Sequence, residues 1–415
     1  VLLVLLPRLG PQLASWIGTD PGPLRHWGLA FGAALVLLLP TTAAMGATLP
    51  AIERLARRVT PECRVIPGLY AANTVGAMLG VLGTAFFLLS ALGLARTLLL
   101  LASLNFVIAA AVWATAGRNE PQKTGRLPPG IPRAPDFPRR LPATLFLTGF
   151  LGLGYEVLVV RVLGQVLEGT VYSFAAVLAV YLAGTALGAA AYQRQLASWQ
   201  SPGRWEQRTA WLLQATATSC LLGTAALWFT EDIYRWVFER AGPGNTGGLA
   251  GELCVATIAL LLPTFCMGAL FSHLVQRGST DHGLGRLLGV NTLGSALAPL
   301  VFGIALLPLL GARLALVALC GGYLVLSAIA FPGSLYRGLI LPGALMAALL
   351  FFIPQPLRFV PQQDGGQVVA YREGVMAAVA VIEETDASRH LAVNNHFLMG
   401  GTASRYSDHR QTHLP

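Results

Sequence analysis

The sequence predicts a polytopic α-helical membrane protein, and three observations support this fold class. Of 415 residues, 54% are hydrophobic and 11% are charged, and the mean hydropathy is +0.62. Soluble domains carry about 25% charged residues, so the composition excludes both an ordinary soluble domain and a disordered chain. The apolar runs are nearly continuous rather than alternating, which favours membrane helices over a β-barrel.

The lengths of the apolar runs predict where the helices cross. A helix needs about 20 apolar residues to span a hydrocarbon core of roughly 30 Å. The segments of suitable length are 27–49, 70–92, 95–116, 143–163, 170–192, 209–228, 250–272, 286–310, 313–331 and 337–353. The last segment is short, so it either crosses the bilayer or lies along its surface. Segment 117–142 is predicted to be a linker, because its six basic residues and many prolines keep it out of lipid.

The basic residues are distributed unequally between alternate loops. Seven lie in one set, and sixteen lie in the other set, 50–69, 117–142, 193–208, 273–286 and 332–337. Loops rich in Lys and Arg stay in the cytoplasm, so the second set is predicted to be cytoplasmic. This distribution explains the net charge of +9 without a nucleic-acid partner. If 337–353 crosses fully, the tail that follows lies outside the cytoplasm.

The chain also contains an internal repeat. The matching segments, in the same order, are Pro40–Ala47 with Pro263–Ala269, Leu69–Gly76 with Leu287–Gly294, and Gly93 with Gly311. The second copy uses six spans within 143–331, and an even number gives both copies the same orientation. The prediction is therefore two parallel six-helix repeats, as in the halves of major-facilitator transporters. The first copy lacks its first two or three helices and Val1 is not methionine, so we expect a fragment.

The expected organisation follows from the repeat. It comprises a truncated first repeat at 1–116, the basic linker at 117–142, a second repeat at 143–335, an additional hydrophobic helix at 336–353 and a β-hairpin segment at 354–415.

Four polar residues in the spans are candidates for a substrate site or cavity. Asn73 and Asn291 occupy matching places in the two copies, and the alternative roles are helix capping and small-residue packing. Glu156 and Arg161 lie on one span, where a charge at the bilayer centre costs roughly 2.5–3.5 kcal/mol. Glu156 is either a proton or substrate site or a structural partner of a neighbouring helix, whereas Arg161 is near enough to the span's end to reach the interface.

Other chemistry is not indicated in the membrane region. The five cysteines show no Cys-x-x-Cys spacing, and no His, Cys, Asp or Glu cluster has the spacing of metal ligands. No metal site is therefore predicted. Pro40 and Pro263 are expected to break or kink their helices just before a Met-Gly pair.

The polar tail predicts a small antiparallel β unit. Segments 368–371, 377–383 and 389–394 have strand character, and 384–388 has the composition of a turn. Such a unit is too small to bury a core alone, so it is expected to need a partner, either a missing C-terminal portion or a second subunit. The tail histidines, of which His390 is the first, are interpreted as surface or packing residues.

Several motifs together resemble a known family. They are Pro40 to Pro50, Tyr70 to Ala77, Tyr371 to Gly374, Ala378 to Val381, Val393 to Thr402 and His413 to Pro415. In this order they resemble the fused bacterial proteins that join major-facilitator-like helices to a spermidine synthase-like domain. The resemblance implies a multi-pass protein of the bacterial inner membrane.

The resemblance further implies an aminopropyltransferase of polyamine biosynthesis, in which an amine attacks decarboxylated S-adenosylmethionine. The glycine-rich loop, acidic ribose contact and catalytic aspartate of such a domain would follow Pro415, so no catalytic residue or cofactor is expected in this chain. The hairpin residues on the substrate side would be Tyr371, Glu373 and Asp408. Leu398 departs from the family pattern, because it replaces a glutamine and cannot form a hydrogen bond.

Two further functions remain open from the residues alone. One is a major-facilitator-like transporter or exporter of a small molecule, in which Asn73, Asn291 and Glu156 would face one cavity. The other is a membrane scaffold without catalysis. The bilayer is the partner common to all three.

Overall fold

The computed structural model describes most of the helical region and part of the tail. The described residues are 22–59, 66–116, 140–195, 204–242, 244–330, 338–351, 356–360, 366–375, 377–394 and 397–402, with a few positions before residue 19. The chain forms two compact units: Val1–Leu55 with Leu82–Pro138, and Ala56–Val81 with Arg139–Pro415. Residues 56–81, which the repeat assigns to the first copy, thus belong to the second unit.

The prediction of a multi-pass helical membrane protein is confirmed. Among the described residues, seven helical stretches are long and apolar enough to cross a membrane: Arg25–Ala56, Ile66–Ala114, Leu141–Leu163, Val171–Gln195, Trp205–Ala241, Asn245–Gly278 and Leu284–Ile329. Two of these stretches each contain two of the predicted spans, bent at a glycine. The segment predicted at 337–353 contains a shorter apolar helix, α13 (Ile340–Phe351).

The first unit contains most of α2 (Pro23–Val59), followed after the gap by the π-helical turn Gly83–Leu88 and α4 (Leu89–Ala116). α2 continues through Pro40, which excludes a break there and is compatible with the alternative expectation of a kink. A helix that loses one hydrogen bond at a proline still satisfies its other backbone groups, whereas a full break in lipid would leave more of them unpaired.

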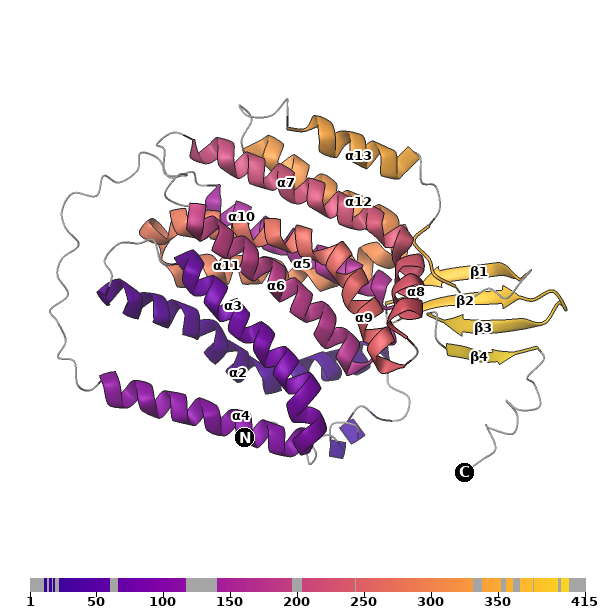
Figure 1. Cartoon of the computed structure of the whole chain (residues 1–415), viewed down its shortest axis with the longest axis horizontal. Helices are drawn as coiled ribbons and strands as arrows, with labels where there is room; N and C mark the ends of the chain where they lie inside the picture. The colour runs from indigo at the N-terminus through magenta and orange to yellow at the C-terminus, as the bar shows by residue number, and fades with distance from the viewer. Residues whose placement is uncertain are drawn as a thin grey trace. The chain divides into compact units, whose positions relative to one another are not determined.

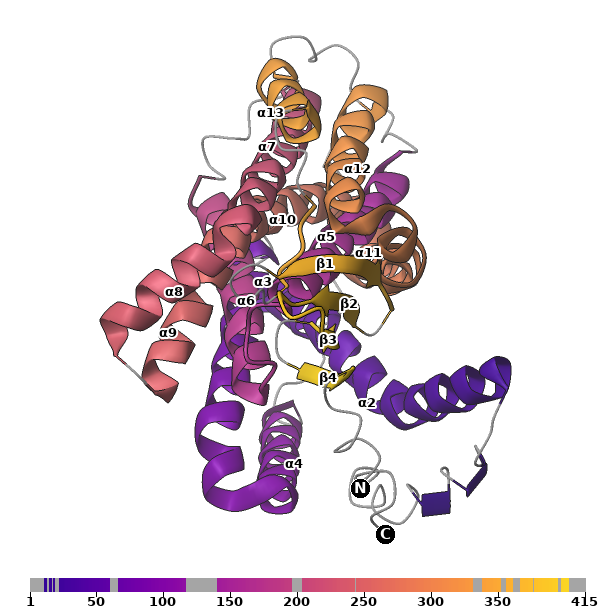
Figure 2. The same ribbon diagram turned by 90° about the vertical axis from the view of Figure 1, so that its right-hand side faces the viewer.

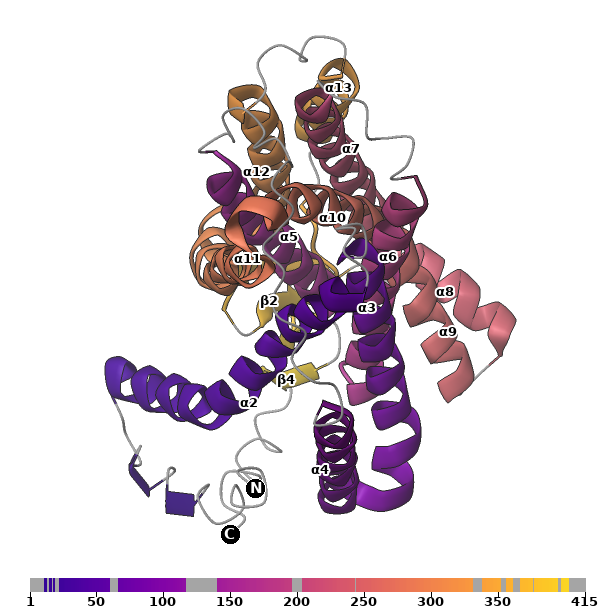
Figure 3. The same cartoon turned by 90° about the vertical axis from the view of Figure 1, so that its left-hand side faces the viewer.

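The second unit is a bundle of helices with the sheet attached (Figures 1 and 3). Its helices are α3 (Ile66–Leu82, up to Val81), α5 (Leu141–Leu163), α6 (Val171–Gln195), α7 (Trp205–Ala226), α8 (Thr230–Ala241), α9 (Asn245–Ala256), α10 (Leu262–His282), α11 (Leu284–Ala298), α12 (Leu307–Ala330) and α13. The main pairings are α5 with α11, α6 with α10 and α7 with α12. Figure 2 shows α13 beside α7 and α12.

Small residues allow two of these pairs to pack closely. A side chain at Gly294 would collide with the carbonyl oxygen of Phe146, and one at Gly149 would collide with the backbone of Asn291. On the α6–α10 pair, Gly268 meets the backbone of Thr185 in the same way. Such close approach is typical of membrane helices, where van der Waals packing drives association.

Two glycines bend their helices in the same way. Gly93 has φ 72° and ψ 172°, and Gly311 has φ 74° and ψ 165°. These angles lie in a region that only glycine adopts without strain. Each bend follows a π-helical turn, Gly83–Leu88 in one case and Pro299–Leu306 in the other.

The helix boundaries around these bends also correspond. α3 and α11 begin at Ile66 and Leu284, and α4 and α12 begin at Leu89 and Leu307. Both pairs are separated by 218 residues, the offset between Gly93 and Gly311. The two matched prolines, by contrast, occupy different places in their helices. Pro263 lies at the start of α10, directly after the π-helical turn Thr257–Leu261, whereas Pro40 lies inside α2.

The tail forms the predicted antiparallel sheet. In its described part the strands are β1 (Gln367–Glu373), β2 (Ala378–Glu383), β3 (Arg389–Val393) and β4 (Phe397–Gly401), paired in sequence order. The first three match the predicted strands, whereas β4 is an addition. The predicted turn is confirmed by a hydrogen bond from Glu384 N to Ser388 O, 2.8 Å long. One face buries Ala380, Ile382 and Ala392.

Candidate functional site

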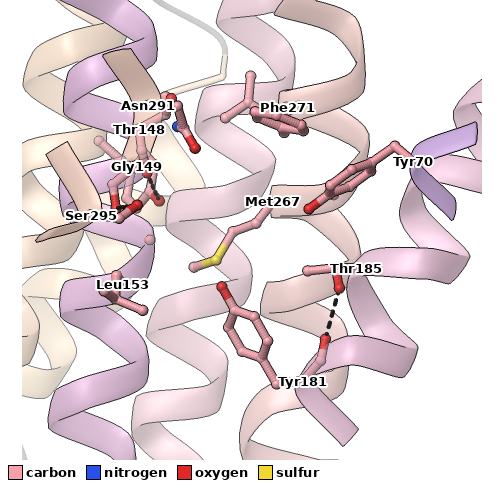
Figure 4. Close-up of a pocket in the computed structure, with 14 residues that line it drawn as sticks. Tyr70, Thr148, Gly149, Leu153, Tyr181, Thr185, Met267, Phe271, Asn291 and Ser295 are labelled. Atoms are coloured by element: carbon pink, nitrogen blue, oxygen red, sulfur yellow. Dashed lines mark hydrogen bonds between the residues drawn. The ribbon is translucent and has the colours of Figure 1, made fainter. Parts of the chain in front are cut away.

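A pocket of about 90 Å³ lies among six helices of the second unit. A polar pocket of this volume can hold water molecules or a small polar group. Figure 4 shows polar side chains of α3, α5, α6 and α11 together with Met267 and Phe271 of α10, and Tyr323 of α12 completes the wall. Its polar residues are Tyr70, Thr148, Tyr181, Thr185, Asn291, Ser295 and Tyr323. Among the described lining residues, none is Lys or Arg.

One wall of the pocket joins α5 to α11 through polar side chains. The Nδ2 atom of Asn291 donates to the carbonyl oxygen of Leu145, 2.9 Å away. One turn further on, the hydroxyl of Ser295 donates to the carbonyl oxygen of Gly149 at 3.2 Å. Because Gly149 has no side chain, α11 can approach the backbone of α5 closely enough for these hydrogen bonds. Asn291 retains its amide oxygen, and Ser295 its hydroxyl oxygen, as acceptors for a molecule in the pocket.

The opposite wall is aromatic. The ring of Tyr70 on α3 packs against Phe271 of α10, with centroids 4.8 Å apart and planes at 48°. In Figure 4, Met267 extends into the space between this pair and Tyr181 of α6. The hydroxyl of Tyr323 lies 3.5 Å from the carbonyl oxygen of Thr148. The pocket therefore combines hydroxyl groups with aromatic faces.

Glu156 places an ionisable group next to this pocket. It is half-buried on α5, one helical turn beyond the lining residue Gly152, and its carboxyl group interacts electrostatically with the Tyr181 hydroxyl on α6. Glu156 thus has a partner on a neighbouring helix, and that partner is itself a lining residue. The arrangement can hold a proton, a cation or a hydrogen-bond donor.

The sequence-predicted residues are distributed over three places. Asn291 lines the pocket and Glu156 adjoins it. Asn73 lies on an exposed face of α3 and is not among the described residues that line the pocket. Arg161 lies farther along α5, where it contacts the tail. Asp408 falls outside the described residues.

Arg161 takes part in a junction between α5 and the β unit. Its Nη2 atom donates to the carbonyl oxygen of Gly374 at 3.0 Å. Just beyond α5, the Oε1 atom of Gln165 accepts from the backbone N–H of Phe359 at 3.1 Å. The predicted hairpin residues meet here, because the Tyr371 hydroxyl donates to Oε1 of Glu373 at 2.6 Å. Burial, together with the Glu373 carboxyl group, raises the pKa of Tyr371, which keeps this hydroxyl protonated.

Two buried polar clusters were not predicted as sites. His273 of α10 has Nδ1 3.2 Å from the Tyr192 hydroxyl and Nε2 3.0 Å from the Thr209 hydroxyl, so it ties together α6, α7 and α10. Glu252 of α9 accepts hydrogen bonds from the Ser173 hydroxyl and the Glu168 backbone N–H. The sequence feature that could have indicated either cluster is a single ionisable residue within an apolar run.

The comparisons with known proteins do not add to this geometry. No protein-family model, no curated protein and no solved structure matches the chain. Among the described residues, no group of at least three His, Cys, Asp or Glu side chains is placed to hold a metal ion. The fold and the pocket define a multi-pass helical membrane protein with a polar site inside its bundle.

Proposed function

We propose that this chain is the membrane part of a protein that binds a small polar solute inside its helical bundle, as a major-facilitator-like transporter or exporter does. The observation that carries the proposal is the pocket beside the Glu156–Tyr181 pair. Ionisable and polar groups inside a membrane are costly, and they commonly mark a solute or ion pathway. The absence of Lys and Arg among the described lining residues favours a cation or a donor-rich solute.

The proposed architecture is two parallel copies of one helical unit. A common offset of 218 residues supports this architecture. The offset separates the start of α3 from that of α11, the start of α4 from that of α12, and the glycine at one bend from the glycine at the other. Tyr70 comes from the first copy and Asn291 from the second, so the pocket draws on both. Transporters built from repeats place their solute sites where the copies meet.

The test is stabilisation of the purified chain by a panel of solutes. Small organic cations such as putrescine and choline are compared with anions of similar size, such as succinate, by thermal unfolding in detergent. A ligand at 100 times its Kd stabilises the folded state by about 2.7 kcal/mol. We expect a cation to raise the melting temperature, Glu156→Gln to remove that effect, and Glu239→Gln on the exposed face of α8 to retain it. A response to anions alone, or one unchanged in Glu156→Gln, would contradict the proposal.

A second proposal retains the family resemblance, and the four-stranded β unit favours it. In this version the bundle anchors a spermidine synthase-like domain of the bacterial inner membrane, completed by a nucleotide-binding domain or a second subunit. Tyr371, Glu373 and Asp408 would line the amine side of that site, and decarboxylated S-adenosylmethionine would be the co-substrate. The amine nitrogen would bond to the aminopropyl carbon, the carbon–sulfur bond would break, and the amine would lose a proton as methylthioadenosine leaves.

Membranes from cells that express the protein test this second proposal. They are incubated with decarboxylated S-adenosylmethionine and putrescine, and released methylthioadenosine is measured. Release that falls in Glu373→Gln but persists in Glu383→Gln would support the transferase. Release no greater than from membranes without the protein would reject it for this chain.

A further inference from the structure

The orientation of α5 fixes two sides of the second unit. α5 begins at Leu141, directly after the basic linker, and Arg140 precedes it. The Nη1 atom of Arg140 donates to the carbonyl oxygen of Ile329, 3.0 Å away in the last turn of α12. The start of α5 and the end of α12 therefore lie at the same end of the bundle.

The β unit is held at the other end of α5. Arg161, in the last turn of this helix, donates to Gly374 between β1 and β2. Gln165 follows the helix and accepts from Phe359, which precedes β1. Figure 1 shows the sheet beyond the ends of the helices, on the side where α8 and α9 meet.

The path of α13 agrees with this placement. Arg313 follows the bend at Gly311 near the start of α12, and its guanidinium group donates to the carbonyl oxygens of Leu349 at 2.9 Å and Leu350 at 2.5 Å. These two residues lie in the last turn of α13. The end of α13 is thus beside the start of α12, opposite Ile329. The chain returns towards the far side before it enters the β unit.

The charge distribution gives these two ends a direction. In the sequence, sixteen Lys and Arg residues fall in the set of alternate loops that contains Arg140, against seven in the set that contains Arg161. Loops rich in basic residues stay in the cytoplasm. We infer that the β unit lies on the non-cytoplasmic face of the membrane, held there against the end of α5 by Arg161 and Gln165.

This location separates the two proposed functions. A solute-binding bundle is compatible with a β unit on the outer face. An aminopropyl transfer that uses a cytoplasmic nucleoside donor is not, because the donor and the hairpin would be on opposite sides.

The experiment is site-directed thiol labelling of the full chain in right-side-out membrane vesicles. The background is Cys63→Ser, which leaves only the cysteines of the membrane helices α7, α9, α10 and α12. The reporter is Thr385→Cys, at the exposed turn between β2 and β3. Matched controls are Glu239→Cys on α8 for the outer side and Gln207→Cys on α7 for the cytoplasmic side, both at exposed positions.

A membrane-impermeant maleimide is expected to label Thr385→Cys and Glu239→Cys in sealed vesicles, and Gln207→Cys only after detergent is added. Labelling of Thr385→Cys only after detergent, together with Gln207→Cys, would overturn the docking of the β unit at the outer face. Labelling of Gln207→Cys in place of Glu239→Cys would overturn the orientation. Labelling of all three in detergent verifies that each variant is made.

Discussion

The Glu156 carboxyl group on α5 interacts with the Tyr181 hydroxyl on α6, and Tyr181 also lines the pocket. This pair connects the charged group that stands out in the sequence with the site that the fold creates. Because α5 also carries Arg161 at its outer end, one helix contacts both the pocket and the β unit.

The contact between α5 and α11 depends on the absence of side chains. We expect Gly294→Ala to destabilise the protein by about 1–3 kcal/mol, because the added methyl group meets the carbonyl oxygen of Phe146 and the helices must separate. Thermal unfolding of the purified chain measures this. Gly289→Ala on the same helix is the control, since nothing lies within 4 Å of its added atom. Equal melting temperatures for the two variants would contradict the packing described.

The bends at Gly93 and Gly311 require glycine. Replacing either residue with alanine is expected to cost about 1–3 kcal/mol, since both have positive φ in a region that other residues avoid. Gly83→Ala, which has open space and no positive φ, should have little effect. Denaturation curves of the three variants check this, and a loss of stability at only one bend would argue against the equivalence of the two proposed copies.

The sequence predicted a correspondence between Gly93 and Gly311 but no bend at either residue. The match between Gly93 and Gly311 was found by comparing the two predicted copies, because glycine is easy to align in an apolar run. The π-helical turns before them were not predicted, since they leave no compositional signal. At Pro40 the sequence allowed a break or a kink, and the continuous helix excludes the break, which would leave more backbone groups unpaired in lipid.

The site was predicted less completely than the fold. Asn291 and Glu156 could be found because polar residues are rare in membrane spans. Tyr70, Tyr181 and Tyr323 could not, because aromatic residues in apolar runs usually fill a core. Which face of each helix meets the pocket depends on tertiary packing, and so does the exposure of Asn73.

The junction at Arg161 predicts how firmly the tail is held. Arg161→Ala removes a charge-assisted hydrogen bond to Gly374, worth about 1.5–3 kcal/mol. The β unit should then be cleaved faster by a protease at the turn around Ala387. Arg235→Ala on α8 removes an exposed ion pair and should leave the cleavage rate unchanged. Identical cleavage rates for Arg161→Ala and the wild type would show that Arg161 does not hold the β unit against α5.

Tyr371 predicts a pH dependence at the alkaline end. Its pKa is raised in the folded protein by burial and by Glu373, so the folded state keeps a proton that the unfolded state loses above about pH 10. This contribution to stability is complete below about pH 10 and is lost as the pH rises towards the folded pKa. Melting temperatures between pH 9 and 11 should therefore fall more steeply for the wild type than for Tyr371→Phe. Parallel slopes would contradict the assignment.

The most direct test of the central claim, a solvent-reachable pocket with an acidic character, is the reactivity of a thiol placed inside it. Ser295→Cys is treated with two methanethiosulfonate reagents of similar size, one an ethylammonium cation and the other an ethylsulfonate anion, and the unmutated chain serves as the blank. The account predicts that the cation reacts faster, on the order of tenfold, and that Glu156→Gln reduces this preference. A thiol that neither reagent reaches, or a preference that Glu156→Gln leaves unchanged, would contradict it.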